Sequence, residues 1–420
     1  MLFAREATLI SCTPTKKLFG IPWQLQKVSG RRQPLPCLKV LVFGLVLLIS
    51  VGWTMQVEAA PAGAPFSITP EVAQLIRNGQ QAMYNCDFQT ADREIDALIR
   101  LYPDHPVGYM YRAVSIWWRC LRDKTNKSLQ DEFLQYADRG IACGEALLKK
   151  NPKDFYALMF LAGIYGNQTR FFLTVPRSRL AAMRSGMKGD KYNRNALALR
   201  PDCIDCLIGT ASYYYAPEAL PPLLKQLASA LGVRGDKAKS LKELELAAEK
   251  GELVQTEAKL ILLGIYYNEK WFEKYENLLR NLIHQYPANH IFYRWYANYC
   301  LEQKRVPDGI RFFSSLLARA AEHRQFAISK GYALLEKGRL ELEQGAQKEA
   351  YSSFSQGIES SPRDQAYLAQ AHLHRGFASD LLKQRSSALQ DYQLVLSLPN
   401  VEETQKMAGR FTKSPYQGKL

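Results

Sequence analysis

The residues of this chain that could most readily do chemistry are the two cysteines of Cys203-Ile-Asp-Cys206. Cysteines with this spacing can form a disulfide, act as a redox couple, or bind zinc together with a second ligand pair. A redox couple of the thioredoxin kind needs a strand-helix-strand context, and neither that context nor a second ligand pair is evident in the sequence. Buried, inert thiols are therefore favoured, a structural disulfide is the alternative, and catalysis is disfavoured.

The six histidines are scattered along the chain and do not form a metal-binding pattern. His372 and His374 are two residues apart, so on a helix they point to different sides, unlike the i, i+4 pair that metals prefer. We also find no phosphate-binding glycine loop, no nucleophile elbow and no kinase or dehydrogenase signature. The sequence therefore predicts no enzymatic activity, no metal and no cofactor.

A repeated spacing of small residues and prolines predicts the secondary structure of the chain, including the segments that carry the cysteines and histidines. Helix-forming residues dominate, and runs of Val, Ile and Thr are nearly absent after residue 60. The repeat occurs three times: Gly79, Ala91 and Pro103; Gly338, Ala350 and Pro362; and Gly376, Ala388 and Pro399. Two helices cross closely only where a small residue lies at the contact, and proline ends the second helix. The spacing predicts helix hairpins, the first beginning at Pro70 after a capping Thr69.

This pattern resembles the tetratricopeptide repeat, a helix-turn-helix unit of 34 residues, over roughly residues 70–400. The resemblance implies an all-α, right-handed α-solenoid of about eight hairpins, with insertions in the middle units. Two departures concern those middle units. Tyr275 stands where the family has a small residue, so the fifth helix pair must splay or repack. Residues 120–130 and 169–193 are predicted to interrupt two hairpins, and residues 220–232 to form a short amphipathic helix.

In this family the first helices of the hairpins line a concave groove. The resemblance implies eight groove residues: Tyr156, Tyr215, Arg294, Asn298, Tyr332, Arg339, Gln370 and Phe377. Arg294 and Asn298 share a helix face and are similar to the basic-plus-amide pair with which some family members hold a peptide carboxylate. The alternative is that these are ordinary groove or interhelix residues. We interpret the aromatic pair Trp117-Trp118 as packing.

The charge of the chain is strongly basic, with 55 Lys and Arg against 40 Asp and Glu. Residues 60–420 alone hold 48 basic and 38 acidic side chains. A surface of this sign aids solubility, and it also attracts acidic proteins, anionic lipids or nucleic acid. Charge therefore leaves several classes of partner open.

The N-terminal segment has the build of a secretory signal. Arg31, Arg32 and Lys39 precede an apolar run over residues 40–51, and small residues make cleavage after Ala59 an expected outcome. The competing interpretation is an uncleaved anchor over residues 40–55, which is slightly shorter than the ~17 to 25 residues that span a bilayer. Either way, the basic excess before the run directs the rest of the chain out of the cytoplasm.

We therefore expect four segments: a leader over residues 1–59, a linker over 60–68, the solenoid over 69–400, and a basic, flexible tail over 401–420. The leading hypothesis is an exported, periplasmic scaffold that binds protein or peptide partners in its groove. The alternative is an envelope protein whose basic surface and 220–232 helix contact anionic lipid or cell-wall polymer. Export argues against a nucleic-acid partner, and neither the partner nor the oligomeric state follows from the sequence.

Overall fold

The computed structural model describes residues 66–122, 124, 126–175, 178–216, 218, 226, 235–322, 330–360, 365–399 and 401–418. The predicted leader and, apart from Gln226, the predicted 220–232 helix lie outside the described residues. Among the helices that the structure describes, none combines the length and apolar character needed to cross a bilayer.

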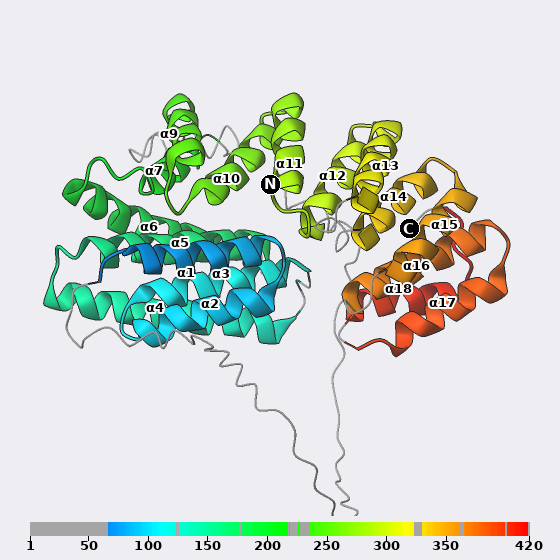
Figure 1. Ribbon diagram of the computed structural model, residues 1–420, viewed down its shortest axis with the longest axis horizontal. Helices are drawn as coiled ribbons and strands as arrows, with labels where there is room; N and C mark the ends of the chain where they lie inside the picture. Colours follow the sequence, from blue (N-terminus) through cyan, green and yellow to red (C-terminus); the bar gives the residue numbers. More distant parts are fainter. Residues whose placement is uncertain are drawn as a thin grey trace, which may run out of the picture. The chain divides into compact units, whose positions relative to one another are not determined.

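Within the described residues the regular secondary-structure elements are all helices, as predicted (Figure 1). The helices are α1 (Pro70–Tyr84), α2 (Phe88–Leu101), α3 (Pro106–Arg122), α4 (Lys127–Lys150), α5 (Phe155–Thr174), α6 (Arg179–Leu199), α7 (Leu207–Tyr215), α9 (Lys237–Lys250), α10 (Gln255–Asn268), α11 (Phe272–Gln285), α12 (His290–Glu302), α13 (Val306–Glu322), α14 (Lys330–Glu343), α15 (Gln347–Ser360), α16 (Gln365–Leu381), α17 (Arg385–Ser397) and α18 (Glu402–Lys413). The first begins as predicted, since Thr69 Oγ1 accepts a hydrogen bond from Val72 N at 3.3 Å.

The described helices from α1 to α17 pack as eight pairs, from α1–α2 through α7–α9 to α16–α17, and the prediction of an all-α solenoid of about eight hairpins is confirmed. The repeated glycines lie at the crossings of their pairs. In each pair the side chain against the glycine is the sixteenth residue after it: Ile95 for Gly79, Phe354 for Gly338 and Tyr392 for Gly376. A Cβ on Gly338 or Gly376 would come within 2.6 or 2.4 Å of a ring carbon, so these two crossings require glycine.

In the second and third hairpins the described residues form unusually long helices. Helices α4, α5 and α6 contain 24, 20 and 21 residues. The predicted interruption over residues 169–193 is therefore wrong for most of that segment, because it contains the end of α5 and most of α6. Long paired helices bury more apolar surface than a loop of the same length, which explains this outcome.

The C-terminal segment also differs from the prediction of a flexible tail. Residues 402–413 form α18, and Val401, Ala408 and Phe411 are buried against α16 and α17. Arg385 fixes the end of α18 by donating hydrogen bonds to the carbonyl oxygens of Phe411 and Thr412 at 2.7 and 2.8 Å. The tail is basic on its exposed side but carries an apolar face, and that face covers the last hairpin.

Candidate binding site

The end of the first hairpin helix contacts residues that are far along the chain. Gln80 Nε2 donates a hydrogen bond to the carbonyl oxygen of Leu253 at 2.7 Å, and the Tyr84 hydroxyl donates one to Glu257. Asn289 Nδ2 donates to the carbonyl oxygen of Tyr84 at 2.7 Å, and the Asn289 side chain is fully buried. The first hairpin is therefore held directly against the fifth and sixth. Side chains of α3, α5, α10 and α12 line one cavity.

Trp118 fills most of this junction. Its ring is fully buried and lies edge-on to Tyr84 and Phe292, with 5.8 Å between ring centroids in each case. Such aromatic contacts add stability beyond the area that they bury. For Trp118 the structure agrees with the interpretation of a packing residue.

Its neighbour Trp117 lines a cavity, which we call the inner pocket. The pocket has a volume of about 150 Å³. It is lined by Trp117 of α3, Arg170 of α5, Leu260, Ile261, Leu263 and Gly264 of α10, and Trp295 of α12. These four helices are the first helices of their hairpins. An apolar cavity of this size is large enough to hold a benzene molecule. The inner pocket can therefore accept one aromatic or large aliphatic side chain.

Gly264 has no packing partner that would require glycine. A Cβ placed there would meet nothing within 4 Å, although a glycine inside a helix costs about 1 kcal/mol relative to alanine. Tyr275 of α11, which stands where the family has a small residue, is itself buried at 1% exposure. Because Gly264 also lines the inner pocket, its missing side chain leaves room there.

Arg170 supplies the charged part of the pocket wall. Its guanidinium carbon lies 4.2 Å from the centroid of the Trp117 ring, a favourable cation–π distance. The same guanidinium donates to Glu257 and, at 2.6 Å, to Asn167 Oδ1. Burial, and then Glu257, raise the pKa of Tyr84 well above its ordinary value, so its hydroxyl stays a donor to Glu257. The pair of Arg170 and Glu257 is neutral overall, and the pocket therefore suits an uncharged group.

Three of the predicted groove residues meet around a carboxylate of the chain itself. Arg294 Nε donates to Glu336 at 3.3 Å, and Arg339 donates to Glu336 and, at 3.1 Å, to Asn298 Oδ1. We call Arg294, Asn298, Glu336, Arg339 and the nearby His374 the Glu336 cluster. Burial favours a raised pKa for Glu336, but Arg339 and Arg294 outweigh it and lower the pKa below its ordinary value. Arg294 therefore already binds a carboxylate of the chain itself, and the predicted pair of Arg294 and Asn298 is joined through Arg339.

The three predicted tyrosines are half-buried, and each contacts another side chain of the chain. Tyr156 lies edge-on to Phe66, the Tyr215 hydroxyl donates to Glu269 at 3.3 Å, and Tyr332 stacks on His290 with 4.4 Å between centroids. They lie on different first helices and the structure does not gather them into one site.

The last two predicted groove residues are covered by the C-terminal segment. Gln370 Nε2 donates to Thr404 Oγ1 of α18 at 2.9 Å. Phe377 is only 2% exposed, and the ring of Tyr416 stacks on it at 4.2 Å. The prediction that Phe377 points into an open groove is wrong, because α18 and the residues after it occupy that surface.

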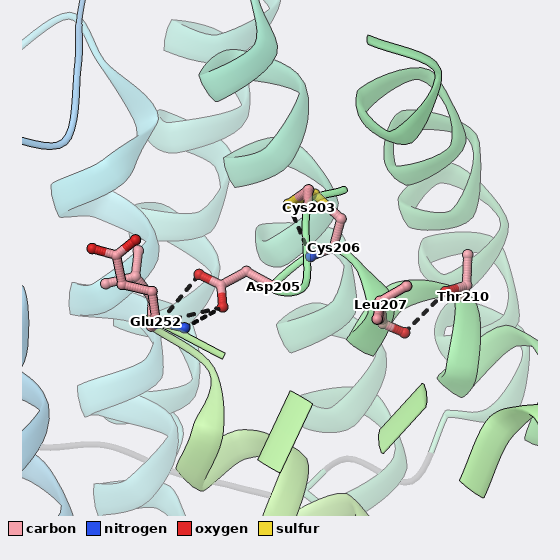
Figure 2. The surroundings of a disulfide bond; sticks show 7 residues. Cys203, Asp205, Cys206, Leu207, Thr210 and Glu252 are labelled. Carbon is pink, nitrogen blue, oxygen red and sulfur yellow. Dashed lines mark hydrogen bonds between the residues drawn. A yellow bond between two sulfur atoms is a disulfide. The ribbon is translucent and has the colours of Figure 1, made fainter. Parts of the chain in front are cut away.

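The cysteine pair is not among the residues that line the inner pocket and lies in the turn between α6 and α7. Cys203 and Cys206 form a disulfide (Figure 2). The sequence favoured buried thiols, and the structure instead contains the alternative, a disulfide. Between the two cysteines, Asp205 accepts hydrogen bonds from the amides of Glu252 at 2.7 Å and Leu253 at 3.1 Å. The bridge thus fixes a turn that ties α7 to the segment before α10. Within the described residues no group of three or more potential ligands could hold a metal ion.

Comparisons with known proteins add little to this description. No family model matches the chain, and no curated protein matches it. Among solved structures it is similar to yeast Tom70, at 13% identity and a TM-score of 0.34, over 83% of this chain and 82% of that one. It is also similar to a tetratricopeptide repeat protein from Parabacteroides merdae, at 13% identity and a TM-score of 0.27, over 81% and 98%. The tetratricopeptide-like fold is therefore assigned from the hairpins and their glycine crossings.

Proposed function

We propose that the protein is a non-catalytic scaffold that binds an extended segment of a protein partner along the first helices of its hairpins. One bulky, uncharged apolar side chain of that segment enters the inner pocket. The observation that carries this proposal is Gly264, which lines the pocket and has no neighbour that would exclude a side chain. A buried aromatic anchor in such a pocket is a common source of binding energy in protein interfaces.

The chemistry of the pocket supports binding rather than catalysis. Apart from Arg170, the lining residues carry no ionisable side chain, and Arg170 is engaged by Glu257 and Asn167. An arrangement of this kind offers apolar contact and aromatic faces but no acid, base or nucleophile. The Glu336 cluster is the less suitable anchor for a partner carboxylate, because Glu336 already neutralises one of its two arginines.

We place this binding outside the cytoplasm, on the strength of the basic residues and apolar run before residue 60. The partner is then a protein of the cell envelope. Its binding segment needs one exposed Phe, Trp, Leu or Met to fill the pocket.

Selection from a displayed random-peptide library tests the proposal on the full chain. We expect the selected peptides to share one bulky apolar residue and to lose about tenfold or more in affinity for the Gly264→Leu variant, because the new side chain fills the pocket. Gly409→Leu is the matched control, since a Cβ at Gly409 of α18 meets no atom closer than 3.9 Å. Peptides without a shared apolar residue, or with equal affinity for all three proteins, would contradict the proposal.

A further inference from the structure

Exposed apolar side chains are concentrated on the third hairpin, α5–α6. Among the described residues, the large apolar side chains that are exposed are Leu173, Leu180, Met183, Met187, Leu199, Leu394 and Leu396. Five of these seven belong to the hairpin α5–α6. Leu180, Met183 and Met187 are 54%, 57% and 64% exposed, and their spacing of three and four residues puts them on one face of α6.

The same helix is strongly basic. It carries five exposed basic residues, namely Arg179, Arg184, Lys188, Lys191 and Arg194. Its single acidic residue, Asp190, is buried and forms an ion pair with Arg194 at 2.6 Å. Arg184 lies one helical turn from both Leu180 and Lys188, and Lys191 follows Met187 by one turn, so charge and apolar surface share the exposed face. The opposite face of α6 packs on α5, through residues such as Ala182 and Gly189.

We propose that this exposed side of α6, which we call the α6 face (Leu180, Met183, Arg184, Met187 and Lys191), binds an anionic lipid surface. Leucine and methionine side chains can enter the boundary between headgroups and acyl chains, while the long stems of Lys and Arg let their charges stay among the phosphates. An anionic membrane attracts each nearby basic side chain.

A membrane suits the α6 face better than a folded protein does. The apolar side chains protrude from a single helix, and a lipid surface accepts such a ridge without a groove of matching shape. The α6 face is also separate from the inner pocket, because α6 is the second helix of its hairpin and contributes no residue to the pocket. Binding to lipid therefore leaves the proposed peptide site free, and either proposal can fail without the other.

Photo-cross-linking of the full chain to vesicles tests this proposal. A photoreactive benzoylphenylalanine replaces Met187 in one protein and, as a matched control, Leu394 in another. Leu394 is also exposed, at 42%, but α17 carries only Arg385 as a basic residue together with Asp391. We expect the probe at position 187 to cross-link to lipid about tenfold more in vesicles with 30% phosphatidylglycerol than in pure phosphatidylcholine, and more than the probe at position 394.

Charge reversal by Arg184→Glu and Lys191→Glu, in the protein with the probe at position 187, should reduce the lipid cross-link about tenfold or more. Unchanged circular dichroism of that variant shows that it still folds. Any attachment through the leader acts equally on all the proteins and cancels in the comparison. Equal cross-linking at positions 187 and 394, equal cross-linking in the two lipid mixtures, or insensitivity to charge reversal overturns the proposal. So does cross-linking in cells to a protein partner in place of lipid.

Discussion

The inner pocket and the Glu336 cluster are both formed by first helices of the hairpins. They differ in whether side chains of the chain itself already occupy the site. At the Glu336 cluster the predicted cations Arg294 and Arg339 bind a carboxylate of the chain itself. At the inner pocket the chain leaves a space of about 150 Å³ beside Gly264. The position of a residue in a repeat thus predicts where its side chain points, whereas its neighbours decide whether it is available to a partner.

The glycines show the same contrast at the level of single atoms. At Gly376 a Cβ would collide with the ring of Tyr392 from the same hairpin. At Gly264 a Cβ would meet no atom within 4 Å. Packing explains the glycine at position 376 but not the glycine at position 264. We therefore expect substitutions at the two positions to have opposite effects on stability.

The largest effect is expected at the Glu336 cluster. Glu336→Ala removes the carboxylate between two arginines and should lower the free energy of unfolding by about 3 kcal/mol. Urea denaturation followed by circular dichroism measures this change. Arg294 is 38% exposed and can turn toward water, so a loss below about 0.5 kcal/mol would mean that solvent replaces Glu336 and that the cluster is not structural.

Acid should weaken the Glu336 cluster through His374. Burial, and then Arg339, lower the pKa of His374 to about 4, whereas an unfolded histidine titrates near 6.5. The unfolded chain therefore binds a proton between these values that the folded chain does not, so stability falls as the pH falls from about 6.5 to 4. Wild type should lose about 2 kcal/mol more than His374→Gln over this range; parallel losses in the two proteins would contradict the assignment.

A smaller loss is expected for Gly376→Ala. The new Cβ would lie 2.4 Å from a ring carbon of Tyr392, which must move within a buried cluster. Overpacking of this kind costs about 1–2 kcal/mol after the gain in helix propensity. A thermal melt of the variant beside wild type checks it, and an unchanged melting temperature would show that this crossing tolerates a side chain.

The smallest effect has the opposite sign. Gly264→Ala adds a Cβ that meets nothing within 4 Å, so it should stabilise α10 by about 0.5–1 kcal/mol. The measurement is the same thermal melt. Destabilisation by Gly264→Ala would mean that packing requires glycine at position 264 as well. Gly264 and Gly376 would then no longer differ in this respect.

Local sequence signals predicted the hairpins but not the site. Thr69, Pro70 and the glycine crossings act within one helix or one helix pair, and these features were predicted correctly. The inner pocket depends on contacts between residues about 170 to 200 positions apart, such as Tyr84 with Glu257, and no repeat spacing encodes them. The interpretation of Trp117 as packing agrees with its 2% exposure, whereas its place in the wall of the inner pocket did not follow from the sequence. One sequence feature pointed to the inner pocket. Gly264 lies in the first helix of a hairpin whose second helix carries Tyr275 in place of a small residue.

The C-terminal errors have a different cause. Charge along residues 401–420 suggested a tail, but Val401, Ala408 and Phe411 are apolar and spaced to lie on one side of a short helix. Three residues in a short segment are a weak periodic signal. Missing α18 led directly to the wrong prediction for Phe377, because α18 and Tyr416 cover it.

The inner pocket should be open to a bulky apolar group that reaches it from solvent. Crystals soaked in bromobenzene test it directly, since the anomalous signal of bromine locates a ring of suitable size. We expect a bromine peak between Trp117 and Trp295 in wild type and in Gly409→Leu, and no peak in Gly264→Leu. An empty pocket in wild type, or a peak that persists in Gly264→Leu although the new side chain fills the space, would contradict it.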